Sequence, residues 1–167
     1  MAKSGGQLVE QTTHNLDLMR YLAGDIKKVS ADMALRVMDD IPGINIPDVC
    51  SVNVVFESGA IGHLDTSFVE QPDGRSSLEV IGRGFRLTLD GTTLTIAEKK
   101  QQTTTYKSQV NFYKEQDDAF IQAIVTGDHS FILAPYEEAL KTLEVTLAAN
   151  DSAKWGRPVT ISQEMAV

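Results

Sequence analysis

The sequence predicts an α+β fold in which helices pack on one face of a large, mostly antiparallel, open β-sheet. Three observations support this prediction. Helical apolar spacing is confined to the regions near the two ends of the chain, strand-like alternation fills the middle, and short turns separate the alternating segments. Strands joined by short turns pair antiparallel, and helices outside such a run cover one face of the sheet. With 167 residues, the chain can bury a core as a single domain.

The first predicted element is a helix from about residue 9 to residue 23, which Gly24 ends. Its apolar side chains recur at helical spacing and therefore share the face expected to be buried. The residues of this face are Leu16, Met19, Leu22 and Ala23.

A run of strands follows the helix. Most of the predicted strands alternate apolar and polar residues, and a turn signal at 72–74 and a strong hairpin signal at 90–91 separate some of them. The run ends at 103–107, which we expect at a sheet edge. The predicted strands span residues 26–37, 48–56, 61–69, 77–81, 85–89, 92–97 and 103–107.

Two further helices and a short strand complete the predicted fold. One helix covers 112–126 and ends at Gly127, and the next opens at Pro135 and runs toward residue 154. A short strand at 159–161 follows. The apolar stripe expected to bury the last helix consists of Leu140, Leu143 and Leu147.

Charge and cysteine content exclude several classes of protein. The net charge of −8 argues against nucleic acid and anionic membranes as partners, since both need clustered Lys and Arg. Cys50 is the single cysteine, which rules out an intramolecular disulfide and fits a cytoplasmic setting. No apolar run approaches the ~18 residues of a membrane span. Residues 1–6 lack the apolar segment of a signal peptide and are interpreted as an abrupt start or a linker, which leaves 7–163 as the domain.

The strongest candidate site lies on the first helix. Glu10, His14 and Asp17 stand at i, i+4 and i+7, so an uninterrupted helix aligns them in one stripe opposite its apolar face. A carboxylate one turn from an imidazole suits proton transfer. A solvated helix face commonly carries the same residue types, and spacing alone leaves both interpretations open. Zinc catalysis uses about three protein ligands, and no second histidine lies nearby, so no metal site is predicted.

Other motifs indicate structure rather than chemistry. Gly82–Gly84 forms a G-x-G, but Leu87 replaces the third glycine and strands rather than a helix follow, so we predict a turn and no dinucleotide site. His63 is expected on a half-exposed sheet surface and His129 in a solvated loop. Cys50 is expected to be a buried, inert thiol.

Taken together, the order of these segments resembles the C-terminal domain of the glucose–fructose oxidoreductase and inositol dehydrogenase (Gfo/Idh/MocA) family. The resemblance extends over nearly the whole chain, through segments 56–62, 79–87, 112–128 and 135–159. Its opening signature is a Gly-Gly pair, a hydrophobic residue, an acidic residue, and then His and Asp at the start of a helix. The matching residues are Gly5, Gly6, Leu8, Glu10, His14 and Asp17.

The resemblance implies a function for the predicted stripe. Family members bind NAD or NADP in an N-terminal Rossmann domain, which is absent from this chain, and bind a sugar, cyclitol or polyol substrate in the C-terminal domain. By resemblance, His14 binds substrate and is the acid/base or its close relay, Glu10 orients it and raises its basicity, and Asp17 holds a substrate hydroxyl. The resemblance also implies that the fragment alone is inactive and forms a homo-dimer or higher homo-oligomer through the open sheet face.

Two departures from the family pattern bear on this interpretation. Glu10 stands where the family usually has Asp, and the family's Glu-Lys-Pro lysine has no counterpart in this chain. One alternative is a free-standing, non-enzymatic ligand-binding or assembly module. A second alternative is a metal-dependent isomerase or hydrolase that uses Glu10, His14 and a distant ligand.

Overall fold

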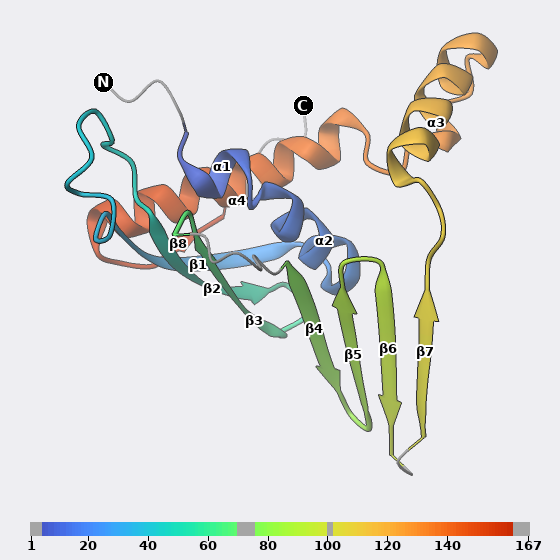
Figure 1. Cartoon of the computed structure of the whole chain (residues 1–167), viewed down its shortest axis with the longest axis horizontal. Coiled ribbons are helices and arrows are strands. Elements are labelled where there is room, and N and C mark those ends of the chain that lie inside the picture. Colours follow the sequence, from blue (N-terminus) through green and yellow to red (C-terminus); the bar gives the residue numbers. More distant parts are fainter. Residues whose placement is uncertain (1–4, 70–75, 100–101, 162–167) are drawn as a thin grey trace. The chain divides into compact units, whose positions relative to one another are not determined.

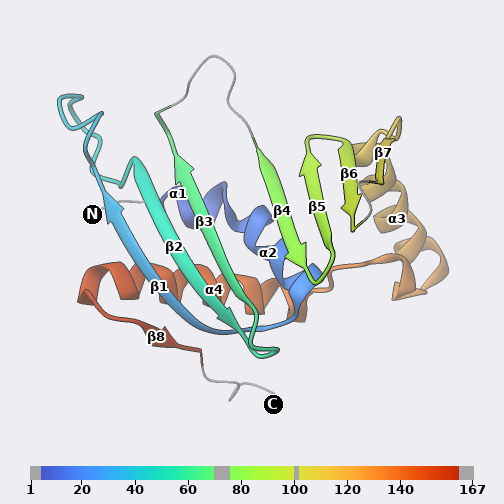
Figure 2. The same cartoon turned by 90° about the horizontal axis from the view of Figure 1, so that it is seen from below.

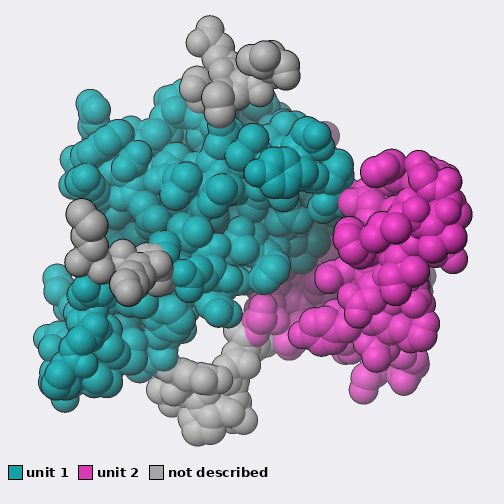
Figure 3. Space-filling view, turned by 90° about the horizontal axis from the view of Figure 1, so that it is seen from above, with its two compact units in different colours: residues 1–70, 134–167 teal, residues 71–133 magenta. Residues whose placement is uncertain are grey.

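The computed structural model describes residues 5–69, 76–99 and 102–161. The chain forms two compact units, one of residues 1–70 and 134–167 and one of residues 71–133 (Figure 3). The turn predicted at 72–74 lies outside the described residues. Among the residues that the structure describes, no helix has the length and apolar character needed to cross a membrane.

The first unit is a four-stranded antiparallel sheet of order β3-β2-β1-β8 with helices on one face (Figures 1 and 2). The last strand of the chain therefore returns to pair with the first. The elements of this unit are α1 (Gln7–Glu10), α2 (Thr13–Ala23), β1 (Ile26–Ala34), β2 (Val49–Phe56), β3 (Ile61–Ser67), α4 (Tyr136–Trp155) and β8 (Val159–Thr160).

The core of the first unit lies between the sheet and these helices. Strand β2 alternates as predicted, with Cys50, Val52, Val54 and Phe56 buried on one face. Opposite Val52, Leu64 of β3 is also buried. Alternation along the strands thus assigned the two faces of this sheet correctly, and the burial of Cys50 is confirmed.

Helix α4 packs through a different face from the one predicted. Leu143 and Leu147 of the expected apolar stripe are 39% and 49% exposed. The buried side chains are smaller, which lets the helix lie close to β1, and their hydroxyls find partners inside; Ser152 Oγ accepts from Ala31 N at 3.1 Å. The buried residues of α4 are Thr142, Val145, Thr146, Ala149 and Ser152.

The predicted single helix over 9–23 is interrupted near its start. Helix α1 ends at Glu10, the backbone N–H groups of Gln11 and Thr12 both donate to Gln7 O at 2.9 and 3.0 Å, and α2 begins at Thr13. Thr12 is buried, and its Oγ1 donates to Thr66 Oγ1 of β3 at 2.9 Å. This contact with a distant strand ties the turn to the sheet.

The second unit is a four-stranded antiparallel meander followed by helix α3 and a short 3₁₀ turn, η1. The Asp90–Gly91 hairpin is confirmed, with Gly91 at a φ of 54°. The apolar side chains of α3 at 120, 121, 124 and 125 are 57–78% exposed. The elements are β4 (Ser77–Gly82), β5 (Phe85–Asp90), β6 (Thr93–Glu98), β7 (Thr103–Lys107), α3 (Phe112–Thr126) and η1 (His129–Phe131).

The predicted fold class is confirmed: the chain is α+β, with open antiparallel sheets and four α-helices among the described residues. The strands divide into two sheets of four, and each sheet belongs to one compact unit. The predicted site residues all lie in the first unit.

Candidate functional site

The three predicted site residues lie on two helices rather than on one continuous stripe. Glu10 is the last residue of α1, whereas His14 and Asp17 lie in the first half of α2. Glu10 and His14 are exposed and Asp17 is half-buried. The turn at 11–12 breaks the i, i+4 relation between Glu10 and His14, while the i, i+3 relation between His14 and Asp17 holds on α2.

Glu10 contacts the backbone just before α1. Its Oε1 accepts a hydrogen bond from Gly5 N at 3.1 Å. Within the described ranges, no hydrogen bond joins Glu10 to His14. The expected orientation of the imidazole by Glu10 is therefore not formed in this structure and stays a prediction.

Asp17 is anchored on one side and open on the other. Its Oδ1 accepts from Thr142 Oγ1 of α4 at 2.7 Å and lies 3.9 Å from Arg20 Nη1. The Asp17 side chain is 41% exposed. A carboxylate held in this way can still accept a hydrogen bond from a ligand hydroxyl.

Arg20 is the buried centre of this site and is not among the residues predicted from the sequence. Its side chain is only 4% exposed and joins α2 to α4. Nη2 donates to Asp25 Oδ1 at 2.6 Å and to Glu138 Oε2 at 2.9 Å. Nη1 donates to Glu138 O at 2.9 Å and to Thr142 Oγ1 at 2.8 Å. The signal in the sequence was a charged residue at the helical phase of Leu16, on the face expected to be buried.

The charges of this cluster stabilise one another. Burial lowers the pKa of Arg20, but its hydrogen bonds to Asp25 and Glu138 outweigh that effect and raise the pKa above its ordinary value. The hydrogen bond from Arg20 lowers the pKa of Asp25. Hydrogen bonds from Lys141 and then from Arg20 lower the pKa of Glu138. The hydrogen bond to Glu138 raises the pKa of Lys141. The side chains of Arg20, Asp25, Glu138 and Lys141 are therefore charged at neutral pH.

A second polar group lies on the face of the β3-β2-β1-β8 sheet that carries no helices. The ring of His63 lies between Asn53 Oδ1 at 3.0 Å and Asp65 Oδ2 at 2.7 Å. The His63 and Asp65 side chains are 52% and 69% exposed, which confirms the predicted half-exposed position of His63. Among the described residues, no group of three or more His, Cys, Asp or Glu side chains is arranged to hold a metal ion.

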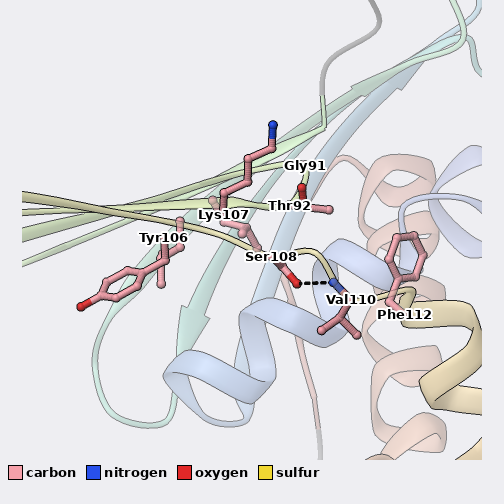
Figure 4. Close-up of a pocket in the computed structure, with 9 residues that line it drawn as sticks. Gly91, Thr92, Tyr106, Lys107, Ser108, Val110 and Phe112 are labelled. Carbon is pink, nitrogen blue, oxygen red and sulfur yellow. Dashed lines mark hydrogen bonds between the residues drawn. The ribbon is translucent and has the colours of Figure 1, made fainter.

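A pocket of about 440 Å³ lies in the second unit, far in sequence from the predicted site (Figure 4). Leu89, Leu94 and Phe112 contribute apolar lining. The hydroxyl of Tyr106 and the amine of Lys107 point in different directions, so they do not converge on one bound group (Figure 4). None of the predicted site residues lines this pocket.

The first unit is an α+β domain in which helices cover one face of an antiparallel sheet. Its first two helices carry Glu10, His14 and Asp17. Residues 1–88 match the family model of the GFO/IDH/MocA C-terminal domain. This match covers more than half of the 167 residues, and the chain belongs to this family. The resemblance seen in the sequence motifs is thereby confirmed.

Curated relatives support the same assignment. The uncharacterized oxidoreductase YrbE of Bacillus subtilis is 24% identical over 168 residues, which cover 95% of this chain and 49% of that protein. Myo-inositol 2-dehydrogenase of Thermotoga maritima is 25% identical over 170 residues, which cover 96% of this chain and 50% of that protein. The chain thus spans about half the length of the curated relatives it matches.

Solved structures share the fold at lower sequence identity. Levoglucosan dehydrogenase in complex with NADH and L-sorbose has a TM-score of 0.80 at 16% identity, over 92% of this chain and 49% of that one. The WlbA dehydrogenase from Bordetella pertussis, in complex with NADH and UDP-GlcNAcA, has a TM-score of 0.72 at 19% identity, over 96% and 46%. These likenesses establish the fold of this chain.

Proposed function

We propose that this chain is the substrate-binding and oligomerisation part of an NAD(P)-dependent oxidoreductase that acts on a sugar, cyclitol or polyol derivative. Membership of the family and the names of the relatives, one a myo-inositol dehydrogenase, support this proposal. The observation that carries it is the half-exposed Asp17 carboxylate, held by α4, three residues from the exposed imidazole of His14.

Each site residue has a role in this proposal. Asp17 accepts a hydrogen bond from one substrate hydroxyl and so positions the reacting carbon near α2. His14 takes the proton from the reacting hydroxyl, or returns it, since an imidazole can both accept and donate a proton. Glu10 would orient His14 and raise its basicity, which requires its carboxylate to leave Gly5 N and turn toward the imidazole.

The described residues contain no glycine-rich turn that leads from a strand into a helix, as dinucleotide binding requires. The sole G-x-G noted above, 82–84, joins two antiparallel strands, β4 and β5, instead of leading from a strand into a helix. We therefore propose that NAD or NADP binds to a part of the protein outside this sequence. What this chain contributes is substrate binding and proton transfer.

The test is an NMR titration of the chain with myo-inositol at millimolar concentrations. We expect chemical-shift changes at His14 and Asp17. Asp17→Asn should bind about tenfold more weakly, because the charged carboxylate that accepts a hydrogen bond from the ligand is lost. Asp117→Asn, at an exposed position of α3 in the second unit, is the matched control and should bind like the wild type. Shifts confined to residues outside α1 and α2, or equal binding by Asp17→Asn, would contradict the proposed function.

A further inference from the structure

A continuous series of hydrogen bonds links the buried guanidinium of Arg20 to the half-exposed carboxylate of Asp17. Arg20 Nη1 lies 2.8 Å from Thr142 Oγ1, which lies 2.7 Å from Asp17 Oδ1. Thr142 is only 2% exposed, so water does not compete for its hydroxyl. At the Asp17 end the series reaches solvent, beside the proposed substrate position.

Chemistry sets the direction of each of these hydrogen bonds. A guanidinium group only donates, so Thr142 Oγ1 accepts from Arg20 and directs its own hydrogen elsewhere. Asp17 Oδ1 at 2.7 Å is the favoured acceptor, because the alternative, Glu138 O, lies 3.5 Å away. The Thr142 hydroxyl is thereby committed to Asp17.

Arg20 itself has little freedom to turn. Its two Nη atoms carry four hydrogens, and four acceptors lie within hydrogen-bond distance of them. Two of these acceptors are carboxylates, which form the stronger, charge-assisted bonds. The acceptors are Asp25 Oδ1, Glu138 Oε2, Glu138 O and Thr142 Oγ1.

We propose that Thr142 and Arg20 are positioning residues for Asp17. They hold Oδ1 of Asp17 toward α4 and so turn its Oδ2 to a substrate hydroxyl. The substrate in this inference rests on the proposed function, while the geometry rests on the contacts above. An acceptor fixed before the ligand arrives spares the side-chain entropy that binding would otherwise cost. Thr142 thus assists binding without touching the ligand.

The test compares three variants of α4 in the intact chain. Thr142→Val removes the hydroxyl and keeps the shape of the side chain, whereas Thr142→Ser keeps the hydroxyl. Thr146→Val is the matched control, because Thr146 is fully buried one turn further along and its Oγ1 donates to Leu143 O at 2.7 Å. The two measurements are the χ1 rotamer of Asp17, from NMR three-bond couplings, and the Kd for myo-inositol.

We expect Thr142→Val to give averaged couplings at Asp17 and about fivefold weaker myo-inositol binding, equivalent to one hydrogen bond. Thr142→Ser and Thr146→Val should retain the wild-type couplings and Kd. If Thr142→Val does not fold, Thr142→Ala replaces it with the same expected results.

Unchanged Asp17 couplings in Thr142→Val, or equal averaging in Thr146→Val, would overturn the proposal. Failure of the proposed function has a different signature. In that case myo-inositol shifts no signal of α2 in the wild-type chain, while the Asp17 couplings still decide the positioning role.

Discussion

The loop that joins β1 to β2 closes around the carboxylate of Asp48. This side chain is fully buried, and its oxygens accept from the backbone N–H groups of Arg36, Val37 and Met38 at 2.9, 2.7 and 2.8 Å. Burial raises the pKa of Asp48, but these three hydrogen bonds outweigh it and hold the pKa below the ordinary value. One residue therefore satisfies three backbone donors that regular structure leaves unpaired.

Replacing Asp48 by Asn should destabilise the fold at neutral pH. The amide turns an NH₂ group toward at least one of the three donors, and we expect Tm to fall by roughly 5 °C or more at pH 7. The folded-state pKa is lowered, so the stabilisation is complete above the unfolded pKa of about 3.9 and is lost as pH falls through the folded pKa. The Tm difference should therefore shrink below about pH 4.

Thermal unfolding of Asp48→Asn and wild type from pH 7 to pH 3 measures this effect. Asp32→Asn, at an exposed position of β1, makes the same charge change, and among the described residues no backbone group bonds the Asp32 side chain, so Tm should stay nearly unchanged. A Tm difference that stayed constant across this pH range would contradict the role assigned to the Asp48 carboxylate.

Helices α2 and α4 are joined by the Arg20 cluster. The guanidinium bonds Asp25 just after α2 and Glu138 of α4, and both carboxylate side chains are 43% exposed. Without Arg20, these carboxylates can be hydrated, so the loss of folding stability is smaller than for a wholly buried ion pair. The two helices would lose the ionic contact that fixes their relative position.

We expect Arg20→Met to lower the free energy of unfolding by about 2–3 kcal/mol at pH 7. The pKa values of Asp25 and Glu138 are lowered in the folded state, so their share of stability is present above about pH 4 and is lost as pH falls further. Urea unfolding at pH 7 and pH 3 should show a smaller effect of the substitution at the lower pH.

Arg86→Met is the control for Arg20→Met, because it removes an arginine from an exposed ion pair. Arg86 pairs with Glu79 at 3.3 Å on the second sheet, but its side chain is 59% exposed. An exposed pair contributes little, and we expect a change below about 1 kcal/mol. Equal losses for Arg20→Met and Arg86→Met would refute the special role of the buried cluster.

For the whole molecule, the face of the first sheet that carries no helices is the surface proposed for self-association. Ile61 is 83% exposed on this face, beside the polar group of Asn53, His63 and Asp65. We expect light scattering to show a dimer at tens of micromolar and Ile61→Lys to shift it toward monomer by at least about tenfold in Kd.

Val125→Lys distinguishes this surface from the other exposed apolar region. Val125 lies on α3 of the second unit and is 78% exposed, so the same kind of change at an equally exposed residue should leave the dimer intact. Monomer alone in the wild type would argue against the sheet interface. A dimer lost only in Val125→Lys would place the interface on α3.

Local patterns in the sequence were enough to predict most elements. Strand β7 and helix α3 have the predicted bounds, and the Asp90–Gly91 hairpin forms as expected. Alternation and turn chemistry act between residues that are neighbours in the chain, so they can be read without knowledge of the fold.

The candidate site could be predicted only in part. His14 and Asp17 share α2 as expected, but Glu10 lies before a break at which the Thr12 hydroxyl donates to Thr66 of β3. No local pattern specifies a hydrogen bond between residues 54 positions apart.

By itself, the sequence determined the α+β class, the antiparallel strands and the family of this chain, because alternation, turns and motif order are properties of nearby residues. Only the tertiary structure decided that Arg20 is buried and that α4 packs through small residues instead of its leucines. Both outcomes depend on what lies opposite in space: the partners of Arg20 and Asp17 on α4 lie more than a hundred residues further along the chain.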